Sequence, residues 1–265
     1  MDVWEGQIPL CVSLAEDSSA SSPPPEPVFV LAPRGTYLPL LVEQLVAHFG
    51  AALPPGCGDA WFSLRGVPLR WQFEVGVLHS LLANDEPLPL QLTLHFRGFP
   101  EAVLARCAGA GAVRSTFFNA LKEAAFLSCG TATGVMTLAS SAQADLWHGI
   151  AMNDWTRFSR GRSALQASLQ ASRRDKASRV AVRLHVRHFK DGGARPWSDV
   201  VSSSHAVAEQ HATLRSFVDS VVVSVANETV VLVQGVTPPW DARLSILHEQ
   251  TCSPDGFLHV VLIAP

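Results

Sequence analysis

This chain of 265 residues has few lysines, no closely spaced pair of cysteines and no long apolar run. No run approaches eighteen consecutive apolar residues without a charge, a proline or a glycine, so we expect no transmembrane helix. The opening residues, Met1 to Glu5, contain neither a basic nor an apolar segment, and the sequence therefore predicts no secretory signal. The composition is 48% hydrophobic and 16% charged, which suffices for a sizeable core. We therefore expect a folded protein of the cytosol or nucleus.

The five cysteines are isolated from one another along the chain. They stand at Cys11, Cys57, Cys107, Cys129 and Cys252, an odd number without a CxxC pair. This pattern argues against a zinc ribbon and a disulfide framework, so we expect reduced thiols and no metal. Motifs of the GxSxG, P-loop and HExxH types are also missing, and no cofactor is predicted. A cysteine-dependent hydrolase stays open, because Cys and His partners meet only in space.

Basic charge is almost entirely arginine and is concentrated in one stretch. Of twenty basic residues, three are lysines: Lys122, Lys176 and Lys190. Residues 157–195 hold eleven basic and two acidic residues, a local net charge of +9. Such asymmetry predicts a surface for an anionic partner, and we expect contact with anionic lipid rather than nucleic acid. We expect this contact to be made by Arg157, Arg160, Arg162, Arg173 and Arg174. The alternative is that the basic stretch is a solvated linker.

The N-terminal hundred residues alternate between strand and helix signals. Strands are expected at 3–14, 28–31, 61–64, 69–71 and 90–96, a loop at 18–27, and helices at 36–49, capped by Thr36, and 75–83. Gly66 lies in the turn of a hairpin. This order fits a β-grasp, the ubiquitin-like arrangement, with a ferredoxin-like fold as the alternative.

The C-terminal third repeats the pattern. Strands are expected at 180–186, 229–233 and 257–263, and helices at 211–218 and 242–249. Gly66-Val67, Trp71 and Leu78-His79 recur as Gly235-Val236, Trp240 and Leu247-His248 at identical offsets, which suggests a duplicated module. Helices are expected between the copies, at 113–128, 135–147 and 154–172. We predict an α+β protein with two ubiquitin-like β-grasp domains (1–100 and 177–265) flanking a small helical domain (101–176).

Ubiquitin-like units raise the question of conjugation. A modifier that is itself attached to targets needs a flexible tail ending in glycine, whereas this chain ends Ile263-Ala264-Pro265. A conjugation acceptor needs a lysine amine, because arginine stays charged. Lys122 lies at the centre of a helical pattern, and its position alone indicates an exposed helix residue.

Several motifs occur in the order found in one family. The run 117–124, Phe-Phe-Asn-Ala-Leu-Lys-Glu-Ala, resembles a conjugation-site helix of the form F-M-N/S-x-x-K-E-A. The opening Val3–Pro9 looks like V-W-x-G-x-I-P, and Leu31–Leu38 looks like L-x-P-R-x-x-Y-L. Gly66–Trp71 resembles G-x-P-L-K-W, and Gly256–Val260 fits the family's ending. Together these motifs resemble the autophagy-related protein 5 family over nearly the whole chain.

The resemblance implies a fold and a function. The family has two ubiquitin-like domains flanking a helical one. Its members accept the ubiquitin-like autophagy protein 12 through an isopeptide bond to the lysine matching Lys122. The conjugate associates with the coiled-coil autophagy-related protein 16 and with an E2-like enzyme. It promotes transfer of the ubiquitin-like autophagy protein 8 to phosphatidylethanolamine.

The expectation is therefore a non-catalytic acceptor and scaffold. It would be cytoplasmic and peripherally recruited to the forming autophagosome membrane. The alternative is a ubiquitin-like adaptor that associates non-covalently and is never conjugated. A lysine at position 122, in a helical pattern, is the feature that separates the two hypotheses.

Overall fold

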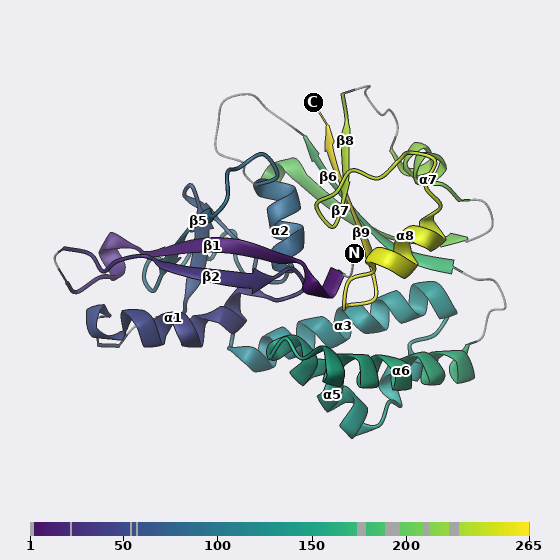
Figure 1. Ribbon diagram of the computed structural model, residues 1–265, viewed down its shortest axis with the longest axis horizontal. Coiled ribbons are helices and arrows are strands. Elements are labelled where there is room, and N and C mark those ends of the chain that lie inside the picture. Colours follow the sequence, from purple (N-terminus) through teal and green to yellow (C-terminus); the bar gives the residue numbers. More distant parts are fainter. Residues whose placement is uncertain are drawn as a thin grey trace. The chain divides into compact units, whose positions relative to one another are not determined.

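The computed structural model describes most of the chain. The described residues are 3–21, 23–53, 55–56, 58–173, 179–188, 197–208, 212–222 and 228–264. Contacts divide the chain into two compact units. The first comprises Gly6–Val113 with Gly192–Trp197, and the second comprises Met1–Glu5, Arg114–Asp191 and Ser198–Pro265. Each unit contains one mixed sheet, and most of the strands are labelled in Figure 1.

The sheet of the first unit has five strands in the order β2-β1-β5-β3-β4. The strands are β1 (Gln7–Leu14), β2 (Val28–Pro33), β3 (Trp61–Leu64), β4 (Val67–Pro68) and β5 (Leu90–His95). β1 is antiparallel to β2 and parallel to β5. Successive side chains of a strand point to opposite faces, so Ile8, Leu10 and Val12 of β1 bury one common face.

The helices of the first unit supply the rest of its core. They are α1 (Val42–Phe49), α2 (Val75–Leu82) and the 3₁₀ turns η2 (Glu16–Ser18), η3 (Leu38–Leu41) and η4 (Gly50–Ala52). The expected cap at Thr36 is wrong, because the 3₁₀ turn η3 precedes α1 and begins after Tyr37. Thr36 instead accepts the backbone hydrogen bond of Val75 at 2.8 Å, and so ties this loop to α2.

The second unit repeats the same strand arrangement. Its strands are β6 (Arg179–His188), β7 (Val200–Ala208), β8 (Val230–Val233) and β9 (Leu258–Ala264), ordered β7-β6-β9-β8 with β6 and β9 parallel. Helices α7 (Leu214–Val221) and α8 (Leu244–Thr251) bury Leu214, Phe217, Val218 and Leu244 in the core of this sheet. The predicted fold class, with two β-grasp domains, is confirmed.

The repeated Gly-Val pairs occupy equivalent turns. Arg65 and Gly66 have φ values of 50° and 79°, and Gln234 and Gly235 have 52° and 78°. Two consecutive residues with positive φ form the hairpin turn whose twist matches that of antiparallel strands, and glycine favours this region. The same turn therefore occurs in both sheets, which agrees with a duplicated module and equally with two β-grasp units that share a turn glycine.

Four helices lie between the two sheets in the sequence. They are α3 (Ala110–Cys129), α4 (Thr133–Met136), α5 (Ser140–Ala151) and α6 (Trp155–Ser172). Gly149 lets α5 approach α6 so closely that a Cβ there would lie 2.6 Å from the Cβ of Phe158. The 3₁₀ turn η1 (Val3–Glu5) adds Trp4, whose ring stacks on Phe158 with centroids 4.5 Å apart.

One short piece of the first unit is distant in sequence. Trp197, in the 3₁₀ turn η5 (Trp197–Asp199), is buried and donates its indole hydrogen bond to Pro68 O at 2.6 Å. Its ring stacks on Phe73 and lies under the guanidinium of Arg70. Among the described helices, none combines the length and the hydropathy that spanning a bilayer requires.

Candidate functional site

The lysine singled out from the sequence lies at the middle of α3. The helix buries Phe117, Leu121 and Ala125 on one side. Lys122 borders this buried side and is itself partly exposed. Among the residues that the structure describes, its ammonium has no hydrogen-bond or ion-pair partner. Its stem therefore packs at the edge of the helix while its amine can reach solvent.

The residue that follows the lysine is tied to the second sheet. Arg183 of β6 donates a hydrogen bond from Nη2 to Oε2 of Glu123 at 2.6 Å. Its guanidinium carbon also lies 3.8 Å from the ring centroid of Phe257, and its Nε donates to Ser204 Oγ at 3.3 Å. A second carboxylate, that of Asp255, lies 3.8 Å from Nη1. Arg183 thus joins α3 to β6, β7 and the loop before β9.

Apolar packing accompanies this polar contact. Ala124 of α3, Ala181 of β6 and Phe257 form a small buried cluster, with Ala120 and Leu127 packed against it. Gly256 completes the approach, since a Cβ at that position would lie 3.1 Å from the Cβ of Ala124. Its φ of +88° falls in the left-handed region that favours glycine. The middle of α3 therefore packs directly on the loop that precedes β9.

Strand alternation explains why these polar groups share one face. Arg183 and His185 are two residues apart on β6, and the register pairs them with Ser204 and Ser202 of β7. The parallel register with β9 places His259 opposite Arg183. The opposite face carries Val182, Leu184 and Val260, which belong to the hydrophobic core.

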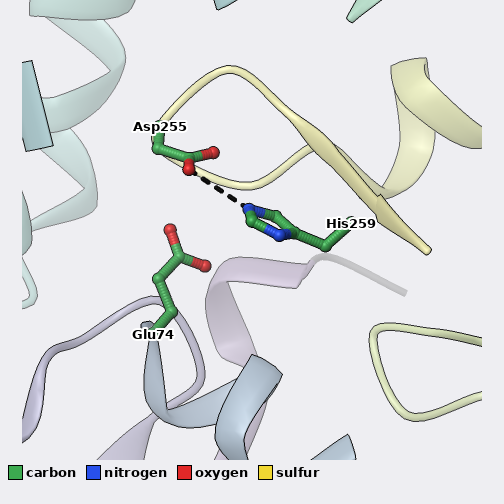
Figure 2. Close-up of side chains that lie close together, drawn as sticks. All are labelled: Glu74, Asp255 and His259. Carbon is green, nitrogen blue, oxygen red and sulfur yellow. Dashed lines mark hydrogen bonds and ion pairs between the residues drawn. The ribbon is translucent and has the colours of Figure 1, made fainter. Parts of the chain in front are cut away.

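A chain of hydrogen bonds runs through this polar face. Ser202 Oγ lies 2.8 Å from His185 Nδ1, and His185 Nε2 lies 3.0 Å from His259 Nδ1. His259 Nε2 lies 3.1 Å from Asp255 Oδ2, the contact drawn as a dashed line in Figure 2. With neutral rings the hydrogens can run from serine to carboxylate, because each ring then donates from Nε2 and accepts at Nδ1. The network needs no solvent to satisfy these ring nitrogens.

Burial sets the protonation states in this network. Desolvation lowers the pKa of His185 well below its ordinary value, and the positive charge of Arg183, with that of His259 when it is protonated, lowers it further. Burial alone would raise the pKa of Asp255. Its contacts with His259, the charge of Arg183 and the hydrogen bond from Phe257 N–H lower it on balance. The carboxylate is therefore held ionised beside the guanidinium, and His185 is held neutral.

This arrangement offers an accessible amine on an anchored helix. A deprotonated lysine amine is a nucleophile toward thioesters and other acyl donors. The sequence predicted Lys122 as the acceptor, which stays a prediction, and it did not single out Arg183, Asp255 or His259. Arg183 was counted only as one charge of the basic stretch, and it lies sixty residues from its partner Glu123. No local motif marks such a contact, because only the tertiary fold brings the two residues together.

Some of the arginines that were predicted to contact lipid lie close to carboxylates or to a backbone carbonyl. Arg157 and Arg160 are exposed on α6 but lie 3.7 Å from Asp154 and 3.6 Å from Asp145. Arg162 is partly exposed, and Arg173 donates to the Ser128 carbonyl at 3.4 Å. Arg174 lies outside the described residues.

Two other members of the basic stretch, Arg183 and Arg187 of β6, expose little of their side chains. Arg187 is only 4% exposed, and Arg183 points into the polar network. The local charge of +9 therefore overstates the positive surface.

The described cysteines are poorly placed for nucleophilic chemistry. Cys11 and Cys129 are buried, and Cys107 and Cys252 are partly buried. Burial raises the pKa of Cys107, which lowers its thiolate fraction. Cys57 lies outside the described residues. These environments disfavour the cysteine-dependent hydrolase left open by the sequence.

Three models of one protein family match successive parts of this chain. They are described as the UblA domain, the alpha-helical bundle region and the UblB domain of autophagy protein ATG5, and they match residues 3–96, 111–166 and 179–262. The first match contains the first sheet with α1 and α2, and the last contains the second sheet with α7 and α8. The middle match contains Lys122.

Curated relatives and a solved structure agree with these matches. Autophagy protein 5 of Aspergillus fumigatus is 30% identical over 308 aligned positions, covering 98% of this chain and 93% of the relative. Autophagy protein 5 of Arabidopsis thaliana is 42% identical over 158 residues, which are 60% of this chain but 47% of the relative; the alignment thus covers less than half of the plant protein. The crystal structure of Kluyveromyces marxianus Atg5 superposes with a TM-score of 0.78 at 20% identity. It covers 98% of this chain and 96% of that one.

Proposed function

Because this chain belongs to the autophagy protein 5 family and thereby has a role in autophagy, we propose that it acts there as a conjugation acceptor. The modifier is the ubiquitin-like autophagy protein 12, and the acceptor atom is Nζ of Lys122. The amine attacks the thioester carbon of the activated modifier, the C–S bond breaks, and the leaving thiolate is protonated. The product is an isopeptide bond.

One observation carries the proposal. Lys122 is a partly exposed lysine without a charged partner among the described residues, on a helix whose buried sides fix its backbone. A lysine held in an ion pair would first have to break that contact before it could react. A fully buried lysine would be out of reach of an enzyme-bound thioester. Lys122 avoids both obstacles.

The test replaces the amine and keeps the charge. Lys122→Arg should abolish the heavier conjugate on a denaturing gel when the chain is incubated with the modifier, its E1-like and E2-like enzymes and ATP, since guanidinium cannot supply the nucleophile. Lys176→Arg and Lys190→Arg are the matched controls and should leave the conjugate unchanged. Mass mapping of the conjugate should place the branch at Lys122. A conjugate that persists in Lys122→Arg would refute the acceptor role, and a wild-type chain that never forms one would favour the non-covalent adaptor.

We further propose that the conjugate is a scaffold without catalytic residues of its own. It would associate with the coiled-coil autophagy-related protein 16 and would assist an E2-like enzyme in transferring the ubiquitin-like autophagy protein 8 to phosphatidylethanolamine. This role places the protein in the cytoplasm, recruited peripherally to the forming autophagosome membrane. Support comes from the family membership and from the matches to its two ubiquitin-like domains.

We also propose that α6 contacts anionic lipid through Arg157, Arg160 and Arg162, with Arg173 and Arg174 following the helix. Exposed arginines on one helix attract anionic headgroups by about 1 kcal/mol each, and the neighbouring Asp145 and Asp154 reduce this gain. The triple substitution of Arg157, Arg160 and Arg162 by Gln should weaken sedimentation with phosphatidylserine vesicles. Substitution of the exposed Arg97 and Arg243 by Gln is the control. Unchanged sedimentation of the triple variant would reject the lipid contact.

A further inference from the structure

The residue after the acceptor lysine is bound to another element, and this bears on how the lysine is presented. We propose that Arg183 is a positioning residue for conjugation: through Glu123 it holds the acceptor segment of α3 on the second sheet and so fixes the direction in which Lys122 leaves the helix. The inference rests on the proposed acceptor role of Lys122.

Arg183 is itself held in place before it contacts α3. Its guanidinium stacks on Phe257, donates to Ser204 and faces the buried carboxylate of Asp255. Only 19% of its side chain is exposed. A planar guanidinium with several fixed contacts loses little further freedom when it binds a carboxylate. The exposed Glu123 therefore meets a preorganised partner, unlike the carboxylate in an ordinary surface pair.

The contact restrains the helix at the level of the lysine. Glu123 is adjacent to Lys122, and Ala124 packs on Phe257 and on the loop at Gly256. Ala124 is about 200° around the helix from Lys122, because each residue advances the helix by about 100°. The second sheet therefore contacts the side of α3 roughly opposite to the one from which the Lys122 side chain projects. The contact with the sheet can therefore restrain the helix without covering the lysine.

Such restraint matters for aminolysis of a thioester. The lysine nitrogen must reach the carbonyl carbon within bonding range and along a narrow approach, so the reaction depends strongly on orientation. A helix that rocks on its support presents the amine over a wider set of positions. The contact can bias that set by no more than its own interaction free energy, which for a charge pair near the surface corresponds to about fivefold in rate.

The experiment measures single-turnover transfer from the preformed thioester between the modifier and its E2-like enzyme, with increasing concentrations of the full chain. Glu123→Ala should lower the maximal rate by about three- to fivefold and leave the half-saturating concentration nearly unchanged. Glu123→Gln keeps an oxygen acceptor for Arg183 and should restore part of the rate. Glu249→Ala removes another exposed carboxylate, on α8, and is the matched control.

The outcomes separate this inference from its premise. A maximal rate for Glu123→Ala equal to that of Glu249→Ala, with Lys122→Arg inactive, would reject the positioning role and keep the acceptor role. Full conjugation of Lys122→Arg would reject the acceptor role itself. A rate loss that tracks a lower melting temperature and disappears on cooling would show a purely structural contact, and would also overturn the inference.

Discussion

At the scale of single residues, the proposed conjugation depends on two adjacent side chains of α3, Lys122 and Glu123. The lysine amine has no charged partner among the described residues, whereas its neighbour binds a preorganised guanidinium. In the proposed role, two adjacent residues of one helix therefore have different tasks: Lys122 reacts, and Glu123 attaches the helix to the second sheet. A shift of either residue by one position along α3 would move its side chain to another face of the helix, because neighbouring side chains of a helix do not share a face.

The sequence marks Lys122 as a candidate, but it does not reveal the contact of Glu123 with Arg183. Lys122 stands in a run that resembles a family motif, so the sequence predicts it as the acceptor, and this role stays a proposal. Arg183 is one of many arginines, and a strand pattern places it on a face without saying what that face meets. The buried His185–His259 contact is also invisible in the sequence, because it joins residues 74 positions apart.

At the scale of elements, regular apolar patterns predicted most strands and helices. The strand Val200–Ala208 was missed because its centre is Ser-Ser-Ser-His, which is not an apolar alternation. It is an edge strand, paired only with β6, and its polar residues supply partners for Arg183 and His185. Tertiary pairing overrides weak strand propensity at such an edge.

Helix packing gives a prediction from two glycines. A Cβ at Gly149 would lie 2.6–2.7 Å from Phe158 atoms, so Gly149→Ala should push α5 from α6 and cost about 1–3 kcal/mol of unfolding free energy. At Gly111, near the start of α3, an added Cβ would meet no described atom within 4 Å apart from its chain neighbours and the backbone of its own helix. Gly111→Ala should therefore gain up to about 1 kcal/mol from helix propensity. Urea unfolding followed by circular dichroism distinguishes the two. Equal effects of both substitutions would contradict the close approach of α5 and α6.

At the scale of the whole molecule, the two units are discontinuous in sequence. Residues near Trp197 belong to the first unit, although the strands on either side of this segment belong to the second. Local sequence patterns predict the structure of successive segments. They cannot predict that a segment between two strands of one unit belongs to the other unit. The division into domains at residues 100 and 176 therefore stays a proposal, while the fold class is established.

Histidines that are partly or fully buried occur in both units, and they predict how stability depends on pH. Burial lowers the pKa of His79, with a further contribution from Arg34. Burial also lowers the pKa of His95, against the charge of Asp17, and lowers that of His185. Each histidine is thus harder to protonate in the folded chain than in the unfolded chain. The unfolded state binds more protons once the pH falls below about 6.5, so acid favours unfolding.

The free energy of unfolding should therefore be highest above about pH 7 and should fall between pH 6.5 and 5. The slope for one histidine cannot exceed about 1.4 kcal/mol per pH unit. Asp255, whose pKa is lowered, adds a second loss only below its ordinary value of 3.8. Urea unfolding followed by tryptophan fluorescence at pH 7.5, 6.5 and 5.5 measures the slope. His95→Gln preserves a hydrogen-bond partner for Ser63 and should make the free energy of unfolding less dependent on pH. His188 is exposed, and His188→Gln serves as the control. Stability that rises on acidification would contradict the burial of these rings, because neutral imidazole is the form that the folded core accommodates.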